Sequence, residues 1–256
     1  MRFLRSCVTG FCFALFGLGS ISLGTGLFPL LFLLPQKNRH RVMLTLNRWA
    51  WRIFVEFVSA LHMISVRLEN EAVLRETRGS IVVANHPTLI DVVLLLAYTP
   101  HTVCVVKGAL LKNVFMRGVV RMVHLCNDLP SNIFVEKAED VLSRGYNILI
   151  FPEGTRTVPG KKSTLHRGAA QLALFAGTDI VPVKISVSPP ILGKHQPWWD
   201  LSDRRVKFVL TVLEPISPQP FAEKTRNRHV CAKRVTEAFW KKIQNAVPAP
   251  EKQKLG

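Results

Sequence analysis

The chain has 256 residues, of which 48% are hydrophobic and 20% are charged, so it can bury a substantial core without disulfides. Its 34 Lys and Arg against 17 Asp and Glu give a formal net charge of +17, which indicates a polyanionic partner. The sequence has no paired Cys/His metal spacing, no aromatic ribonucleoprotein motif and no basic heptad region, which favours an anionic membrane over nucleic acid. The five cysteines form no CxxC pair, as is typical of a reduced compartment.

A long uncharged segment runs from Ser6 to Gln36, with basic residues at both ends. A helix that spans a bilayer needs about 20 apolar residues, and this segment is longer. Two interpretations follow: one tilted spanning helix from about Cys7 to just before Pro29, or a two-helix hairpin in one leaflet that bends at residues 24–26. A cleaved signal peptide fits poorly, because its apolar core would have only about 7–15 residues before a small-residue cleavage site.

The flanking sequence bears on location and domain boundaries. The basic cluster at 37–41 predicts that the following domain lies in the cytoplasm, with the protein on a cell inner membrane. Apolar residues at helical spacing in 44–66 predict an amphipathic helix, either at the headgroup boundary or in the core. We therefore expect a membrane and amphipathic helical region at 1–68, a catalytic domain at 69–247 and a disordered basic tail at 248–256.

The remainder alternates between strand-like and helix-like segments. Short apolar, β-branched runs predict strands at residues 80–84, 102–106, 147–151, 180–187 and 206–213. Amphipathic patterns predict helices at residues 89–98, 109–124, 134–143, 167–176 and 227–245. This alternation indicates an α/β domain with a largely parallel sheet flanked by helices, preceded by the membrane-embedded helix or helical hairpin.

The first group of chemically active residues is the sequence NHPTLID, residues 85–91, which follows a predicted strand and opens a helix. His86 therefore lies at the carboxyl edge of the sheet, where ligand crevices form in open α/β folds. Asp91 follows about a turn and a half later and can reach one imidazole nitrogen, so that the other nitrogen accepts a proton. Because no G-x-S-x-G nucleophile turn is present, this pair is suited to activate a hydroxyl of the substrate itself.

The second group is FPEGTRT, residues 151–157, again directly after a predicted strand. Gly154 allows the backbone to approach a ligand closely. Arg156 offers a fork of donors that matches phosphate or carboxylate, and Glu153 can orient that guanidinium or contact the substrate. The alternative interpretation is a turn stabilised by a Glu–Arg ion pair.

Together, NHPTLID and FPEGTRT, about sixty residues apart, resemble the glycerolipid acyltransferase family typified by 1-acyl-glycerol-3-phosphate acyltransferase. The resemblance covers residues 81–187 and implies the glycerol-3-phosphate acyltransferase-like fold. It also implies catalytic roles for His86, Asp91 and Lys107, with Lys107 steadying the oxyanion. The acceptor phosphate would be bound by four residues, namely Glu153, Gly154, Thr155 and Arg156.

The resemblance implies transfer of a fatty acyl group from acyl-CoA or acyl-carrier protein to a lysophospholipid hydroxyl, giving phosphatidate from 1-acyl-glycerol-3-phosphate. Membrane lipids and the acyl donor are the expected partners, with no metal, no bound cofactor and no nucleic acid. One departure concerns the acceptor. Relatives often end the middle motif with an arginine, whereas residues 123–128 here read VHLCND, and Arg121 lies in a different register.

Alternatives to this function remain open at this point. They are transfer to a different lipid acceptor, a hydrolase that uses the same base on water, a non-catalytic membrane scaffold, and a metal site at His86 and Asp91. The pair Trp198-Trp199 is interpreted as core packing, with an acyl pocket or a membrane contact as its alternatives.

Overall fold

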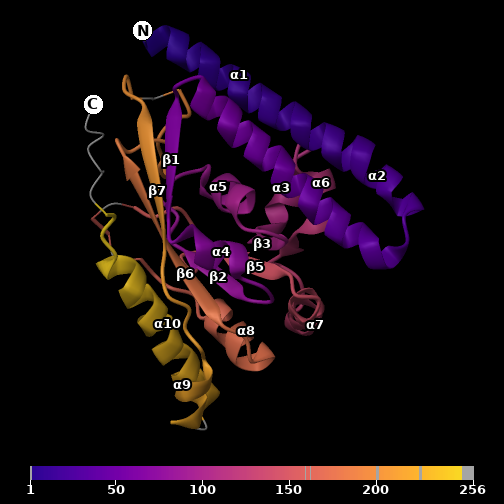
Figure 1. Ribbon diagram of the computed structural model, residues 1–256, viewed down its shortest axis with the longest axis vertical. Coiled ribbons are helices and arrows are strands. Elements are labelled where there is room, and N and C mark those ends of the chain that lie inside the picture. Colours follow the sequence, from indigo (N-terminus) through magenta and orange to yellow (C-terminus); the bar gives the residue numbers. More distant parts are fainter. Residues whose placement is uncertain (1, 159, 162, 200–201, 225–226, 250–256) are drawn as a thin grey trace.

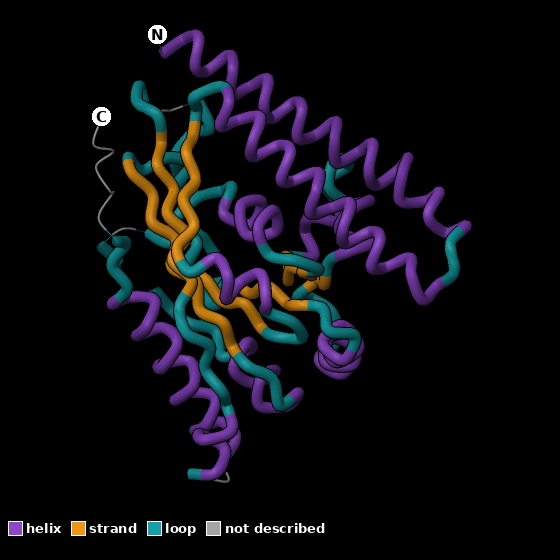
Figure 2. The backbone as a smooth tube through the Cα atoms, in the orientation of Figure 1, coloured by secondary structure: helices purple, strands orange, loops and turns teal. Residues whose placement is uncertain are grey.

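The computed structural model describes residues 2–158, 160–161, 163–199, 202–224 and 227–249. Its centre is a seven-stranded sheet with the order β1-β7-β6-β2-β5-β3-β4, covered by helices on both faces (Figures 1 and 2). The strands are β1 Ile64–Glu69, β2 Ile81–Ala84, β3 Thr102–Val106, β4 Leu125–Cys126, β5 Asn147–Ile150, β6 Ile180–Ser188 and β7 Val206–Val212. Every pairing is parallel except β6 with β7, which confirms the predicted α/β architecture.

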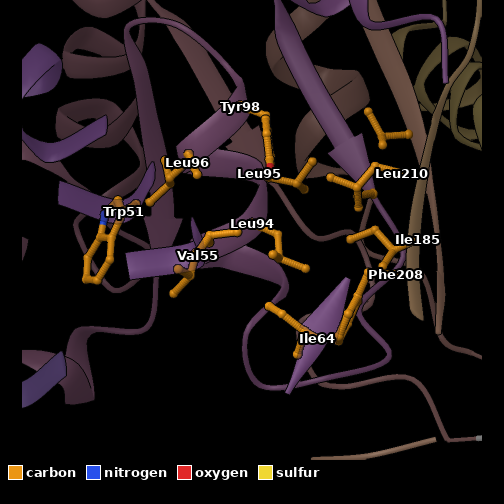
Figure 3. Close-up of a cluster of buried hydrophobic side chains, with 14 of the residues drawn as sticks. Trp51, Val55, Ile64, Leu94, Leu95, Leu96, Tyr98, Ile185, Phe208 and Leu210 are labelled. Atoms are coloured by element: carbon orange, nitrogen blue, oxygen red, sulfur yellow. The ribbon is translucent and has the colours of Figure 1, made fainter. Parts of the chain in front are cut away.

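The helices form two layers on the sheet. They are α1 Arg2–Ile21, α2 Phe28–Leu30, α3 Gln36–Ala60, α4 Glu71–Glu76, α5 Asp91–Tyr98, α6 Arg117–Val123, α7 Ser131–Ser143, α8 Gly168–Ala176, α9 Gln219–Glu223 and α10 Arg228–Asn245. Helices α3 and α5 pack on one face, where Trp51 and Leu94 belong to one buried cluster with strand residues such as Phe208 (Figure 3). Helices α7, α8 and α10 bury the other face, with Phe239 fully buried at its centre.

Two predicted helices differ from those in the structure. The predicted helix at 44–66 is wrong at its end, because α3 stops at Ala60 and β1 begins at Ile64. Strand β1 pairs with β7 along residues 64–69, so the sheet begins before residue 69. The predicted helix at 109–124 is two pieces, a 3-10 turn Gly108–Lys112 and α6.

The apolar amino-terminal segment is one long helical rod. Helix α1 continues through a π-helical stretch, Ser22–Leu27, into α2 and a 3-10 turn, Leu31–Leu33. The chain reverses at Leu34–Pro35, and α3 returns antiparallel beside α1 (Figure 1). Of the two interpretations, the hairpin with a bend at 24–26 is therefore wrong, since the π-helical stretch contains these glycines without breaking the rod. Residues 5–33 are long and apolar enough to cross a membrane.

Glycines at seven-residue intervals join α1 to the rest of the molecule. A Cβ at Gly10 would lie 3.6 Å from the Trp198 ring, and one at Gly17 would lie 3.1 Å from the Phe115 ring. A Cβ at Gly24 would come within 2.7 Å of the Gly118 backbone. Because these positions share one face, α1 lies lengthwise on the α/β domain, with its opposite side exposed.

The close approach of Gly24 to Gly118 predicts a large effect for a single methyl group. Gly118→Ala is expected to lower the free energy of unfolding by about 1–3 kcal/mol, because the new methyl group would overlap the Gly24 backbone. Backbone atoms in a helix cannot move away from such an overlap as the end of a flexible side chain can. Gly19→Ala is the matched control, since its Cβ meets nothing within 4 Å and alanine favours a helix. Thermal unfolding in detergent measures both; equal midpoints for the two variants would show that the rod does not dock in this way.

Candidate active site

The predicted residues converge because they follow neighbouring parallel strands. Strands β2, β5 and β3 lie side by side, so the segments after them meet at one carboxyl edge. His86 follows β2, residues 151–157 follow β5, and Lys107 follows β3. Five of the seven predicted residues line one cavity at this edge: His86, Lys107, Gly154, Thr155 and Arg156.

The histidine and the aspartate form the predicted pair. His86 Nδ1 lies 2.8 Å from Asp91 Oδ2, and Asp91 is fully buried in the first turn of α5. The backbone N–H of Thr88 donates to the same Oδ2 at 2.7 Å, and its hydroxyl donates to Oδ1 at 2.5 Å. The Phe151 ring stacks on the imidazole with centroids 4.4 Å apart. These contacts fix the ring and leave Nε2 as the nitrogen that can take a proton.

The electrostatics of Asp91 follow from its position. Burial raises the pKa of its carboxyl group, and the hydrogen bonds from His86 and Thr88 act in the opposite direction. A buried carboxylate without these donors would be costly, so the imidazole and Thr88 are needed to keep it ionised. The pair is therefore arranged to stabilise an imidazolium when Nε2 accepts a proton.

Glu153 points away from the cavity and toward the His86 segment. Its buried Oε1 accepts from the His86 backbone N–H at 3.1 Å and from the Thr157 hydroxyl at 2.6 Å. Its Oε2 accepts from the Ser163 hydroxyl at 2.5 Å, and the Thr157 N–H donates to the His86 carbonyl at 2.7 Å. The two motif segments are thus tied together. A contact of Glu153 with the acceptor stays a prediction, whereas its observed contacts are with the histidine segment.

Three further residues of the second motif line the cavity: Gly154, Thr155 and Arg156. Gly154 has φ +60°, and a Cβ there would also lie 3.0 Å from the His166 ring, so a side chain would strain the backbone and displace the imidazole. Arg156 Nη1 donates to the carbonyls of Leu192 and Gly193 at 2.9 and 2.8 Å. These bonds fix the guanidinium and leave Nε and Nη2 to meet an anion.

The cavity has a volume of about 1240 Å³ and extends from the polar edge into an apolar chamber. Side chains from α1, α3 and α5 line the chamber, among them Phe16, Trp51 and Val93. On the opposite side the cavity reaches α7 and α8, with Phe134 and Phe175 in its wall. It is large enough for a hydrocarbon chain beside a polar head.

Comparison with known proteins agrees with this arrangement. Residues 65–186 match the family model described as Acyltransferase. This segment is an acyltransferase domain.

Curated proteins that are similar in sequence to this chain are named as lipid acyltransferases. The chain is 26% identical over 175 residues to sheep 1-acyl-sn-glycerol-3-phosphate acyltransferase alpha, covering 64% of this chain and 58% of the relative. It is 30% identical over 175 residues to lyso-ornithine lipid O-acyltransferase of Pseudomonas aeruginosa, covering 66% and 65%. The chain thus spans about three fifths of the sheep protein.

A solved structure shares the fold. The crystal structure of the 1-acyl-sn-glycerophosphate acyltransferase PlsC from Thermotoga maritima superposes with a TM-score of 0.71. The superposition covers 97% of this chain and 100% of the Thermotoga maritima chain, at 20% sequence identity. At this identity the likeness establishes the fold, which includes the long amino-terminal helices.

Several residues that shape the acyltransferase site were given no role from the sequence. Thr88 holds both oxygens of Asp91, and Phe151 holds the His86 ring. Asn85 links the end of β2 to β6, because its side-chain amide donates to the Ile185 carbonyl and accepts from the Ile185 N–H. Short polar residues next to the motif histidine are a usable signal for Thr88 and Asn85, but their partners become visible only in three dimensions.

Cys104 is a poor candidate for a nucleophile although it lines the cavity. Burial raises the pKa of its thiol to about 12, which keeps it protonated near neutral pH. Within the described residues, no group of three His, Cys, Asp or Glu side chains is placed to hold a metal ion. The protonated thiol of Cys104 favours a base that acts directly on a substrate hydroxyl over an enzyme nucleophile at this position.

The divergent middle motif contains a half-buried histidine, His124. His124 Nδ1 accepts from the Cys104 backbone N–H at 3.2 Å, which requires that nitrogen to be unprotonated. Burial, with a smaller contribution from the charge of His40, lowers the pKa of His124 to about 4. The neutral imidazole is thus part of the folded structure.

His124 predicts a loss of stability in acid. Its folded-state pKa lies below the ordinary value of 6.5, so its contribution is complete above pH 6.5 and is lost as pH falls toward 4. The loss is at most about 3 kcal/mol, because each pKa unit corresponds to about 1.4 kcal/mol. Unfolding of wild type and His124→Gln between pH 7 and 4 measures it. The variant should lose less stability over this interval; parallel curves would contradict the assignment.

Proposed function

We propose that the protein transfers a fatty acyl group from a thioester donor to the free hydroxyl of a lysophospholipid, with 1-acyl-glycerol-3-phosphate as the first candidate acceptor. The observation that carries the proposal is the His86–Asp91 pair at the edge of a cavity that has Arg156 on one side and an apolar chamber on the other. This arrangement provides a base, an anion site and room for an acyl chain within one continuous space.

The chemistry follows from these positions. His86 Nε2 removes the proton of the acceptor hydroxyl as that oxygen attacks the thioester carbonyl. Asp91 stabilises the imidazolium, and Lys107, which lines the same cavity, would stabilise the oxyanion. The tetrahedral intermediate collapses, the C–S bond breaks, and the imidazolium can return its proton to the thiolate. Acyl-CoA and acyl-carrier protein both fit as donors, and no bound cofactor is needed.

The amino-terminal rod supports a membrane location for the lipid substrates. Its side away from the domain exposes large apolar residues, and α3 adds two more to the same region. These residues are Phe11, Leu15, Leu18, Leu30, Phe32, Leu33, Trp49 and Ile53. We propose a cell inner membrane, with the acyltransferase domain in the cytoplasm.

A second acceptor class is supported by one observation. Asp128 lies two residues after β4, in the segment that lacks the expected arginine, and its carboxylate fills the space that a Cβ of Gly108, the residue after Lys107, would take. An acidic group beside Lys107 suits an acceptor that carries an amine as well as an anion. The similarity to a lyso-ornithine lipid O-acyltransferase points in the same direction.

The role of Arg156 provides the test. In Arg156→Gln the KM for lysophosphatidate is expected to rise by about 10–100-fold, because a charge-assisted contact worth about 1.5–3 kcal/mol is lost. The KM for the acyl donor should change little. Lys161→Gln is the control, since this neighbouring lysine is exposed. An unchanged acceptor KM in Arg156→Gln would remove the arginine from acceptor binding.

A further inference from the structure

The loop that joins β6 to β7 carries two adjacent tryptophans at the surface. The side chains of Trp198 and Trp199 are 44% and 57% exposed and meet edge to face, with centroids 5.4 Å apart. The expectation that they pack in the core is therefore wrong. Neither ring lines the cavity, so a role in the acyl pocket is not supported either.

The tryptophan pair is attached to the first turns of α1. The Trp198 ring lies edge-on to Phe13, with centroids 6.0 Å apart, and covers Gly10. The Ser6 hydroxyl donates to the Trp199 carbonyl at 3.3 Å, and the Arg5 guanidinium donates to two carbonyls further along the loop. The loop and the beginning of the rod therefore form one surface.

The same loop is attached to the acyltransferase site. Its Leu192 and Gly193 carbonyls hold Arg156, and the Leu89 N–H donates to the Leu192 carbonyl at 3.1 Å. Leu192 is buried and lines the cavity. A few residues therefore separate the wall of the anion site from the exposed indole rings.

The composition of this surface suits one partner. Exposed basic residues accompany the indole rings on the loop, namely Lys194, His195, Arg204 and Arg205. The surface continues into the apolar side of α1, where Phe11 and Leu15 are exposed. Tryptophans gather at the headgroup boundary of bilayers, and nearby Lys and Arg are attracted to anionic lipids.

We propose that the β6–β7 loop is a membrane contact in its own right, in which Trp198 and Trp199 enter the headgroup region of an anionic bilayer. Through Leu192 and Gly193, this contact holds the Arg156 side of the cavity at the level of the lipid headgroups. An acceptor lipid then reaches Arg156 without leaving the interface. The membrane contact does not depend on which lipid is acylated, and only the kinetic effect described below rests on the proposed function.

Tryptophan fluorescence in vesicles tests the contact. Full-length protein is reconstituted in phosphatidylcholine vesicles with phosphatidylglycerol, with and without lipids brominated near the headgroup. We expect Trp198→Phe/Trp199→Phe to lose a large part of the quenching seen in wild type. Trp240→Phe is the control: this residue lies on α10, on the far side of the sheet from α1 (Figure 1), and its loss should leave the quenching intact. Phenylalanine preserves ring packing on Gly10, and the melting temperature in detergent verifies folding.

A kinetic measurement separates this proposal from the proposed function. In Trp198→Ser/Trp199→Ser the KM for an acceptor embedded in vesicles should rise by about tenfold, as expected when two indole rings lose partial burial. The KM for a short-chain acceptor in solution should not change. Unaltered quenching in the phenylalanine variant would overturn the membrane contact, whatever the activity. Quenching that is lost while both KM values stay at wild type would retain the contact and overturn its link to acceptor delivery.

Discussion

His86→Ala is expected to lower kcat by about 10²–10⁴-fold, the range that a positioned general base contributes. Asp91 holds one imidazole nitrogen of His86, and the Phe151 ring stacks on the imidazole face. An alanine at position 86 leaves this position without a proton acceptor. The KM for either substrate should change little, because the ring removes a proton rather than holding a substrate. Steady-state transfer in detergent, with purified wild type and variant, measures the effect.

Two further variants make this result specific. His62→Asn is a control at an exposed histidine with a left-handed backbone conformation. Asparagine tolerates this conformation, so the variant should keep full activity. Asp91→Asn should also lower kcat, because an amide cannot stabilise the imidazolium as a carboxylate does. If His86→Ala transferred acyl groups at the wild-type rate, catalysis by this residue would be rejected and a scaffold role would gain support.

Glu153→Ala is expected to be the most damaging change outside the catalytic pair. It removes the acceptor shared by the His86 N–H and the hydroxyls of Thr157 and Ser163. The His86 N–H keeps Thr157 Oγ1 as an acceptor at 3.1 Å, so the Thr157 and Ser163 hydroxyls are the donors that lose their partner. Their loss should cost about 2 kcal/mol of stability, since an unsatisfied buried group costs about 1–3 kcal/mol and these two are only partly buried. The activity should fall about 100-fold or more, because a small displacement of the base spoils its alignment.

The conservative variant distinguishes the two roles considered for Glu153. Glu153→Gln keeps the shape and one acceptor oxygen, so a positioning role predicts a reduced kcat with a nearly unchanged acceptor KM. A direct contact with the acceptor predicts the reverse, a raised acceptor KM with kcat preserved. Thr157→Val is the matched comparison, because it removes one partner of the same carboxylate. A variant as active and as stable as wild type would contradict both roles.

The sheet was predictable where strands were short apolar runs between helices. Strands β2 and β5 are bordered by polar or turn residues, and their predicted bounds agree with the structure to within a residue. Strand β1 was missed because α3 ends at Ala60 without the usual glycine or proline signal, and the turn instead uses His62 at φ 57°. Strand β4 has only two residues, and its pairing with β3 depends on tertiary contacts that no local pattern encodes.

The site was predictable as a set of residues, but not in the directions of their side chains. Position after a strand was enough to bring His86 and Arg156 to one edge, since adjacent parallel strands share that edge. The orientation of Glu153 toward the His86 backbone depends on packing between β2 and β5, which the motif alone does not reveal. Trp198 illustrates the same limit, because the composition of its segment does not show that the loop lies on α1.

Acceptor-dependent transfer is the most direct measurement of the central claim. Purified protein in vesicles is given a labelled acyl donor with lysophosphatidate, with an amine-bearing lysolipid, or with no acceptor, and the labelled products are separated. We predict that labelled diacyl lipid forms only when a lysolipid is present, in an amount equal to the thiol released. With His86→Ala, labelled diacyl lipid should be nearly absent. Release of free fatty acid at the same rate without any acceptor would contradict acyl transfer and identify a hydrolase instead.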